Sequence, residues 1–325
     1  MLTTEQILER IEAETGGIYF DLKPRSLFEP IEYTLSLGGK RIRPVMTLLA
    51  CNAFSDNIDA AVKPALGMEV FHNFTLLHDD LMDQADKRRN KLTVHKKWNT
   101  NTAILSGDAM MIAAYQLIGE TGEPHLKRIL DLFSVTAMEI CCGQQYDMEF
   151  EQRDTVAEND YIEMIRLKTA VLIACCLKTG AIVGGASEAE ASKLYDAGLN
   201  IGLAFQIQDD MLDVYGDTDT FGKNIGGDIL CNKKTYLLIK AYELADSKQK
   251  ETMEWYKNPA NSFTPQEKIS AYTDIYNALC IRDIAQSRID GFFKLAMRDI
   301  DSPEVGRSNL KELKRFANML MLRES

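Results

Sequence analysis

The sequence of 325 residues has only two tryptophans, four histidines and eight prolines, and it has no long apolar run. The longest run, Ala170 to Leu177, falls far short of the roughly 20 residues that a membrane helix needs. Basic residues are in deficit, since 37 of them face 48 acidic residues for a net charge of -11. We therefore expect no transmembrane segment and no nucleic-acid partner. An anionic substrate would need metal ions or a local basic cluster.

Cysteine spacing and the first residues of the chain bear on its location. The seven cysteines are odd in number and lack the spacing of a zinc site, so we expect reduced core thiols. The segment Met1 to Arg10 carries charge and helical periodicity instead of the apolar block of a secretory signal. These two features predict a cytoplasmic protein.

The sequence also lacks convincing strand patterns and Gly/Ser-rich linkers. Apolar residues instead recur at three- and four-residue spacing, which indicates helices. Helix-start signals occur at Thr3, Ser187, Thr264 and Ser302. The expected helices cover about 42–54, 58–84, 100–119, 125–150, 159–182, 188–215, 234–256, 266–298 and 304–322. We expect an all-α chain that folds as a single domain over residues 1–325.

An acidic pentad occurs twice, each time within an apolar helical stretch. The first and fifth positions of a pentad lie on one face of a helix, so their carboxylates repel each other. Such groups are costly to bury without a counter-ion, and a hard divalent cation suits them. The candidate metal ligands are Asp79, Asp80, Asp83, Asp209, Asp210 and Asp213.

Three loops combine glycine with basic residues: the segment 38–44, the pair Arg88-Arg89 after the first pentad, and the segment 216–235. Each alone has an ordinary explanation, namely a solvated turn, arginines at a helix C-terminus, or a flexible loop. Together with the pentads they indicate a phosphorylated substrate that is bridged by metal within an apolar helical cavity. Neither a P-loop nor an EF-hand pattern is present.

The ordered set of motifs resembles the trans-isoprenyl (polyprenyl) diphosphate synthases over nearly the whole chain. The matching motifs are Gly38-Gly39-Lys40-Arg41-Ile42-Arg43-Pro44, His72, both pentads, Arg88-Arg89, Gly107-Asp108, Gly143-Gln144 with Asp147, Lys168-Thr169, Gln206, Gly222-Lys223, Gly226-Gly227-Asp228 and Lys233. Asn90 stands where the family commonly has glycine, and asparagine tolerates left-handed backbone. The resemblance implies an isoprenoid-synthase-type helical bundle around a deep central cavity, with the pentads facing each other across its mouth, and a homodimer.

The resemblance also implies a reaction and its ligands. A prenyltransferase of this type joins isopentenyl diphosphate to an allylic diphosphate (dimethylallyl, geranyl or farnesyl), with three Mg²⁺ ions that Mn²⁺ can replace. Asp79 and Asp83 would hold two ions and Asp209 the third. The residues implied for the allylic diphosphate are Arg88, Lys168, Lys223 and Lys233; those for isopentenyl diphosphate are Gly39, Lys40, Arg43, His72 and Arg89. Lys168, Thr169 and Gln206 are the implied catalytic residues, and His78 and His95 are expected to make structural hydrogen bonds.

Product length would be set by residues that precede the first pentad on its helix. In the family an aromatic residue five positions before the first aspartate limits growth, and here it is Phe74, followed by Thr75, with Phe71 behind it. Both aromatics could equally be ordinary core residues. The pattern resembles synthases of geranylgeranyl diphosphate; farnesyl diphosphate and longer polyprenyl products are alternatives. A class I terpene cyclase is disfavoured by the second pentad, and a non-catalytic partner subunit by the complete ligand set.

Overall fold

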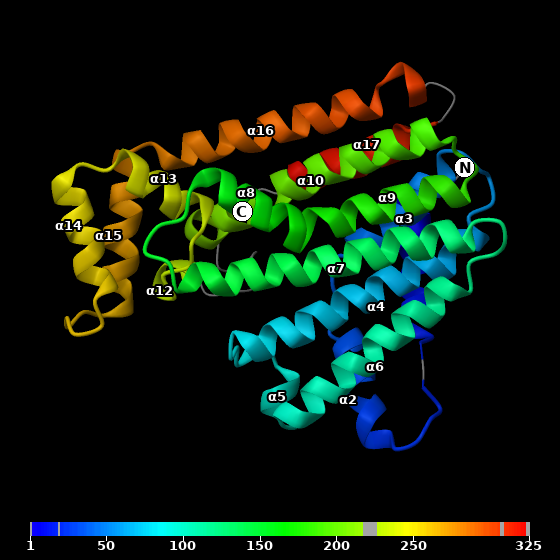
Figure 1. Cartoon of the computed structure of the whole chain (residues 1–325), viewed down its shortest axis with the longest axis horizontal. Helices are drawn as coiled ribbons and strands as arrows, with labels where there is room; N and C mark the ends of the chain where they lie inside the picture. The colour runs from blue at the N-terminus through cyan, green and yellow to red at the C-terminus, as the bar shows by residue number, and fades with distance from the viewer. Residues whose placement is uncertain (1, 19, 217–225, 306–308, 323–325) are drawn as a thin grey trace. The chain divides into compact units, whose positions relative to one another are not determined.

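The computed structural model describes residues 2–18, 20–216, 226–305 and 309–322, and it confirms the all-α prediction (Figure 1). The longer helices are α1 (Thr4–Gly16), α2 (Arg25–Ser36), α3 (Ile42–Asn52), α4 (Asp59–Met82), α6 (Thr100–Gly119), α7 (Leu126–Glu151), α8 (Glu158–Ile165), α9 (Val171–Val183), α10 (Glu188–Tyr215), α13 (Tyr236–Leu244), α14 (Ser247–Lys257), α15 (Pro265–Ala278), α16 (Ile281–Ile300) and α17 (Lys311–Met321). The shorter pieces are α5 (Val94–Lys97), the π-helix η1 (Arg166–Ala170), α12 (Gly227–Leu230) and the 3-10 helix η2 (Pro303–Val305). Within the described ranges the only strands are β1 (Lys87–Arg88) and β2 (Lys91–Leu92), which pair antiparallel.

The chain forms two compact units, each built from segments that lie far apart in the sequence. The first unit comprises Met1–Thr136, Leu172–Gly198 and Asp299–Phe316. The second unit comprises Ala137–Val171, Leu199–Arg298 and Ala317–Ser325. The expectation of a single domain around a deep central cavity stays a prediction.

In the first unit, α4 lies along α6 and also contacts α3 (Figure 1). Gly67 of α4 permits the close approach of α6, because a Cβ there would come within 2.6 Å of the Ile118 side chain. Larger side chains, among them Met68 and Phe71, fill the remaining space. Burying each large side chain contributes roughly 1.5–3 kcal/mol to stability. The helix that ends at the first pentad is therefore firmly held along its length.

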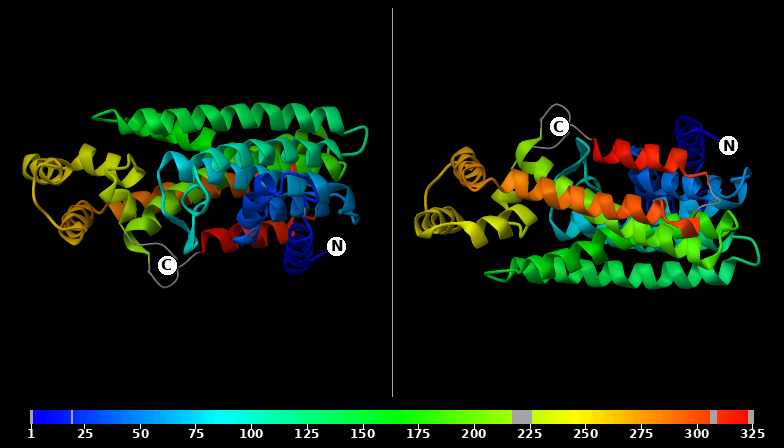
Figure 2. Two further views of the ribbon diagram at one scale, coloured as in Figure 1. Left: turned by 90° about the horizontal axis from the view of Figure 1, so that it is seen from below. Right: turned by 90° about the horizontal axis from the view of Figure 1, so that it is seen from above.

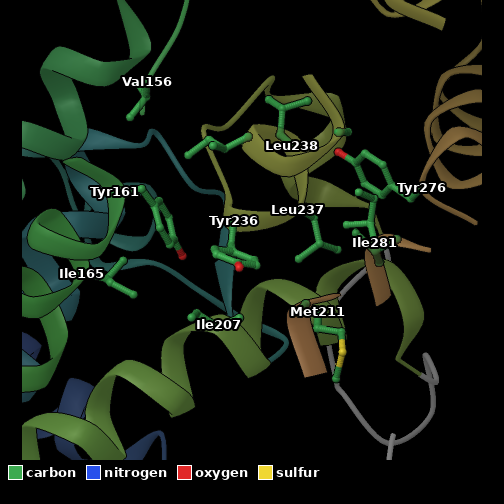
Figure 3. Packing of buried hydrophobic residues seen from close by; sticks show 14 of the residues in the cluster. Val156, Tyr161, Ile165, Ile207, Met211, Tyr236, Leu237, Leu238, Tyr276 and Ile281 are labelled. Carbon is green, nitrogen blue, oxygen red and sulfur yellow. The ribbon is translucent and has the colours of Figure 1, made fainter. Parts of the chain in front are cut away.

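The second unit has its own core, in which tyrosines are prominent (Figure 3). Tyr161 from α8 and Tyr236 from α13 lie near Ile207 of α10, and Tyr276 of α15 contributes at another edge of the cluster. Helices α14 and α15 pack side by side in both views of Figure 2. The C-terminal half of α10, which carries the second pentad, therefore rests on an aromatic core.

Several helix predictions are confirmed closely, and three were too long. The expected helix 234–256 is divided because Ala245 is extended and Asp246 caps a new helix by accepting from the backbone N–H of Gln249. The expected helix 266–298 is divided at Cys280, whose φ of 53° lies in the left-handed region. Residues 304–322 are not one helix, because Pro303–Val305 forms a 3-10 turn and α17 begins at Lys311.

Two further features were missed. The expected helix 159–182 contains the π-helix η1, which widens one turn without altering the apolar pattern enough to be recognised. Helix α2 was not predicted, and Pro30 lies inside it. The helix starts at Thr3, Ser187 and Thr264 are confirmed, since each side chain and its partner three residues on exchange hydrogen bonds with the backbone.

All seven cysteines are free, as expected, but the expectation that they lie in the core is only partly right. Cys51, Cys175 and Cys176 are buried, whereas four are exposed: Cys141, Cys142, Cys231 and Cys280. Cys141 and Cys142 lie at exposed positions of α7, and Cys231 and Cys280 lie at helix ends, so apolar periodicity did not separate them from buried residues. Across the described ranges, every helix is either too short or too polar to traverse a lipid bilayer.

Candidate active site

The first pentad straddles the end of α4, and its three aspartates have different surroundings. Asp79 is half-buried and Asp83 is exposed, whereas Asp80 is 6% exposed. The Nε of Arg88 donates to Oδ2 of Asp80 at 2.7 Å. Burial raises the pKa of Asp80, and the guanidinium of Arg88 opposes that rise. The middle aspartate therefore pairs with a cation of its own chain, while Asp79 and Asp83 lie about 40° apart at another position around the helix.

The β1–β2 hairpin directs Arg88 and Arg89 in different directions. Its turn residues Arg89 and Asn90 have φ values of 50° and 61°, so the left-handed backbone that we expected asparagine to tolerate is indeed present. The guanidinium of Arg89 lies against Gly39, where a Cβ would come within 2.7 Å of its terminal nitrogen. Gly39, with a φ of 141°, thus leaves the space that Arg89 occupies. The hairpin brings two predicted isopentenyl-site residues together.

His72 lies among the arginines of this region. Burial lowers the pKa of His72 well below its ordinary value, and the charges of Arg43 and three further arginines act in the same direction. The imidazole is therefore neutral at neutral pH, in surroundings with an excess of positive charge. An anionic group bound there would remove that excess.

Arg41 has a structural role that the sequence did not reveal. It stands at the N-cap of α3 with a φ of 47°, and its side chain is buried instead of reaching solvent with Lys40. Its Nη1 donates to Glu69 Oε1 at 2.8 Å, and Asn73 donates to the same oxygen at 3.1 Å. This buried network ties the basic loop to α4, three residues before His72. The one signal available was Glu69 itself, an acidic residue in an otherwise apolar helical face.

The two histidines expected to make hydrogen bonds differ. His78 packs against Gly107, and its Nε2 lies 3.3 Å from the carbonyl oxygen of Ile104. The prediction is wrong for His95, because both of its ring nitrogens are buried without a hydrogen-bond partner among the described residues.

The second pentad repeats the arrangement of the first with different donors. Asp210 is 4% exposed and accepts from the Tyr161 hydroxyl at 2.5 Å and from the Tyr236 N–H at 3.0 Å. The amide of Gln206 donates to its other oxygen at 3.2 Å. Burial raises the pKa of Asp210 to about 7, and the hydrogen bonds from Tyr161 and Tyr236 oppose that rise. Asp209 is half-buried on another face of α10.

Asp213 fastens the segment that follows the pentad. Its Oδ2 accepts from the backbone N–H of Asp228 at 3.0 Å, and its carbonyl oxygen accepts from Gly226 at 2.6 Å. Lys233 lies nearby, with Nζ 4.0 Å from Asp228 Oδ1. The predicted phosphate contact Lys223 lies outside the described residues.

The three predicted catalytic residues meet at the π-helix η1. Lys168 and Thr169 belong to it, and the Thr169 hydroxyl donates to Gln206 Oε1 at 3.0 Å. Lys168 Nζ donates to Asp147 of α7 at 2.6 Å. Gly143 of α7 permits this approach, because a Cβ there would come within 2.3 Å of the Lys168 backbone nitrogen. Turns of π-helix are rare in proteins, and many of those that do occur lie at functional sites.

Phe74 and Phe71 belong to a row of aromatic rings in the first unit. The ring centroids of Phe71 and Phe74 are 5.4 Å apart, and Phe71 contacts Phe133 of α7 edge-on at 4.9 Å. Phe133 in turn contacts Tyr115 of α6 at 4.8 Å. Phe71 is buried, whereas Phe74 is only partly buried. The Thr75 hydroxyl is turned back to the carbonyl of His72 at 2.8 Å.

The donor chemistry fits a divalent cation that is shared with a substrate. In the described residues, no three His, Cys, Asp or Glu side chains form a ready-made metal cage. Asp79 and Asp83 supply two carboxylates from one helical face, close to the guanidinium of Arg88. Mg²⁺ is commonly held by one or two carboxylates together with phosphate oxygens and water.

Comparison with known proteins decides the family. The model of the Polyprenyl synthetase family matches residues 24–275. The chain belongs to the polyprenyl synthetase family. Its members use a divalent metal and elongate prenyl chains from isopentenyl and allylic diphosphates, and the present chain is a prenyltransferase of this kind.

Individual relatives agree with this membership. The geranylgeranyl diphosphate synthase of Methanosarcina mazei is 40% identical over 223 residues, which cover 68% of this chain and 69% of the relative. A crystal structure of a geranylgeranyl pyrophosphate synthase is 41% identical, with a TM-score of 0.92 and full coverage of both chains. A polyprenyl synthase from Caulobacter crescentus CB15, complexed with calcium and isoprenyl diphosphate, is 26% identical with a TM-score of 0.83, covering 99% of this chain and 95% of that one.

The buried ion pair of Arg41 generates a stability prediction. We expect Glu69→Ala to lower the free energy of unfolding by about 3–5 kcal/mol, because it leaves a buried guanidinium without its partner. Urea denaturation measures the change. The control Glu120→Ala removes the exposed ion pair with Lys63, whose atoms are 3.6 Å apart, and is expected to change stability by less than about 1 kcal/mol. Equal effects of the two substitutions would contradict the assignment.

Proposed function

We propose that this prenyltransferase joins isopentenyl diphosphate to an allylic diphosphate and that its main product is geranylgeranyl diphosphate. The observation that carries the proposal is the cluster of arginines around a neutral His72, together with an Arg88 that Asp80 holds in place. Farnesyl diphosphate is the alternative product. Two of the relatives described above are geranylgeranyl diphosphate synthases, and they support geranylgeranyl diphosphate over farnesyl diphosphate as the product.

We assign the isopentenyl diphosphate to the basic loop, His72 and the hairpin. Lys40, Arg43 and Arg89 supply cations, and the backbone at Gly39 lies against the Arg89 guanidinium. The neutral imidazole of His72 can donate one hydrogen bond to a diphosphate oxygen without adding further charge. Support comes from the excess of positive charge that already lowers the pKa of His72.

We assign the allylic diphosphate to the pentads and their basic neighbours. Asp79 and Asp83 would hold two Mg²⁺ ions and Asp209 a third, with Mn²⁺ as a substitute. Bound metal neutralises the charge on the leaving diphosphate. Asp80 and Asp210, which are buried and hydrogen-bonded, orient these ligands. Arg88, Lys168 and Lys233 contact the phosphate oxygens, and the same role is proposed for Lys223.

The reaction then proceeds in three steps. The allylic C–O bond breaks, and its electron pair leaves with the diphosphate. The double bond of isopentenyl diphosphate attacks the allylic cation and forms the new C–C bond. Loss of a proton, which we assign to the departed diphosphate as acceptor, restores a double bond. Thr169 and Gln206 lie beside the reacting carbons, and apolar side chains exclude water from the cation.

A product assay tests the proposed function. Purified protein is incubated with isopentenyl diphosphate, Mg²⁺ and dimethylallyl, geranyl or farnesyl diphosphate, and the dephosphorylated prenols are sized by chromatography. We expect a C20 prenol as the main product and its loss when EDTA removes the metal. The matched variant Asp79→Asn should lower kcat by about a hundredfold or more, since it removes a metal ligand. A cyclic hydrocarbon would indicate a terpene cyclase, and no product at all would indicate a non-catalytic subunit.

We also propose that Phe74 limits product length. It is partly buried at the near end of the aromatic row, and Phe71 behind it is braced by Phe133. A growing chain would therefore meet Phe74 first and the braced Phe71 next. Thr75 adds little bulk, because its hydroxyl is bound to the helix backbone.

Phe74→Ala is expected to shift the products toward lengths above C20, because it opens the first level of the aromatic row. The control Phe292→Ala removes a partly buried ring on α16 and should leave the length distribution unchanged. Chromatography of the prenols measures both. An unchanged distribution for Phe74→Ala would assign that residue to packing alone.

We further propose a cytoplasmic homodimer. Helix α6 exposes Leu105 and Ile112, which lie seven residues apart on one face and are 59% and 58% exposed. Val135 of α7, 61% exposed, follows Ser134, which accepts a hydrogen bond from Tyr115 of α6. Exposed apolar side chains on two helices that contact each other suit burial against a second copy.

Ile112→Glu is expected to shift the protein from the dimer toward the 36.6 kDa monomer, because it would place a charge in the proposed interface. Light scattering after size-exclusion chromatography measures the mass. The control Leu244→Glu alters a similarly exposed leucine on α13 and should leave the dimer intact. A wild-type monomer, or an Ile112→Glu dimer of undiminished affinity, would exclude this interface.

A further inference from the structure

Tyr161 is a buried residue that neither the family motifs nor the proposed mechanism uses. It is 2% exposed within the core of the second unit. Its ring lies beside Tyr236, and its hydroxyl is directed toward the α10 segment that carries Ile207 (Figure 3). That hydroxyl donates to Asp210 Oδ2 at 2.5 Å. A core tyrosine thus makes a single polar contact with Asp210, the second residue of the second pentad.

Two further hydrogen bonds connect Asp210 through Gln206 to Thr169 of the π-helix. Oδ2 of Asp210 accepts from Tyr161 and from the Tyr236 N–H, so the carboxylate is oriented with Oδ1 toward Gln206. The Gln206 amide donates to Oδ1 at 3.2 Å, and its own oxygen accepts from the Thr169 hydroxyl at 3.0 Å. Four side chains are therefore connected by hydrogen bonds that converge on the Asp210 carboxylate, from Tyr161 on one side and from Thr169 through Gln206 on the other.

The direction of these hydrogen bonds determines what the Thr169 hydroxyl presents to the substrate. If the Gln206 amide were reversed, its carbonyl would face a carboxylate oxygen, and two acceptors would oppose each other. In the observed orientation the Thr169 hydroxyl donates its proton to Gln206, so its oxygen lone pairs remain available. An oxygen that presents lone pairs favours a neighbouring carbocation, whereas an O–H directed at the cation does not.

We propose that Tyr161 is a positioning residue: through Asp210 it fixes the orientation of the Gln206 amide and thereby the direction of the Thr169 hydroxyl. The inference rests on the proposed function, in which Thr169 and Gln206 lie beside the reacting carbons. Without the Tyr161 hydroxyl, Oδ2 of Asp210 retains only the Tyr236 N–H, so the carboxylate that the Gln206 amide binds through Oδ1 is held less firmly. The residues assigned to the diphosphate group of isopentenyl diphosphate include none of these four.

The test compares two tyrosines with the same structural loss. Tyr161→Phe and Tyr272→Phe each remove one buried hydroxyl that donates one hydrogen bond, the second to the Met253 carbonyl at 3.0 Å. Both rings belong to the same core and are 2% exposed. We expect similar small decreases in Tm, but a kcat decrease of about tenfold or more for Tyr161→Phe alone, with KM for isopentenyl diphosphate within about twofold. Equal kcat values for the two variants would overturn the proposal.

A double-mutant cycle with Thr169→Val separates positioning from stability. If Tyr161 acts through Gln206 and Thr169, adding Tyr161→Phe to Thr169→Val costs little more than Thr169→Val alone. Independent effects would instead multiply, and that result would also overturn the proposal. A wild-type protein that elongates no prenyl chain would refute the proposed function. Active wild type with a multiplicative cycle would refute only the role of Tyr161.

Discussion

A carboxylate that leaves water must find a donor, and this constraint shapes both acidic pentads. Asp80 meets it with the guanidinium of Arg88, and Asp210 meets it with a tyrosine hydroxyl and a backbone N–H. Leaving either group unpaired would cost several kcal/mol. Once the middle aspartate is fixed in this way, helix geometry places the first and fifth aspartates on a different face. The buried residue therefore helps to orient the aspartates that are proposed as metal ligands.

The need to pair buried charges also divides the arginines of the first unit into a buried, paired residue and residues that surround His72. Arg41 is withdrawn from the basic loop into a buried pair with Glu69, and Asn73 completes the acceptor's coordination. The remaining cations, among them Arg43 and Arg89, surround His72 and suppress its protonation. Arg41 thus fixes the loop to α4, and the other arginines remain available to an anionic ligand. A loop of like charges is tolerated because a diphosphate partner would neutralise it.

Most helices could be predicted because their apolar periodicity is strong, as in 100–119, which coincides with α6. The breaks between consecutive helices could not be predicted, since the apolar pattern continues on both sides of the left-handed Cys280 and of the helix cap at Asp246. The acidic pentads and basic loops of the candidate site were predicted from residue type and spacing, whereas the roles of His72, Thr169 and Gln206 came only from the family resemblance. The division of these candidates into buried and exposed members was not predicted, because the burial of Asp80, Arg41 and Asp210 depends on hydrogen-bond partners elsewhere in the sequence.

The π-helix η1 shows how tertiary contacts sustain a local structure that the sequence alone disfavours. A π-turn has poorer backbone geometry than an α-turn and persists where surrounding contacts over-determine it. Here Gly143 admits the backbone of Lys168 to close contact, and Asp147, one turn further along α7, binds its ammonium group at 2.6 Å. Gln206 holds the next residue, Thr169, from α10. Steric space, an ion pair and a hydrogen bond act on adjacent residues, so the widened turn is retained where the two side chains must diverge to separate partners.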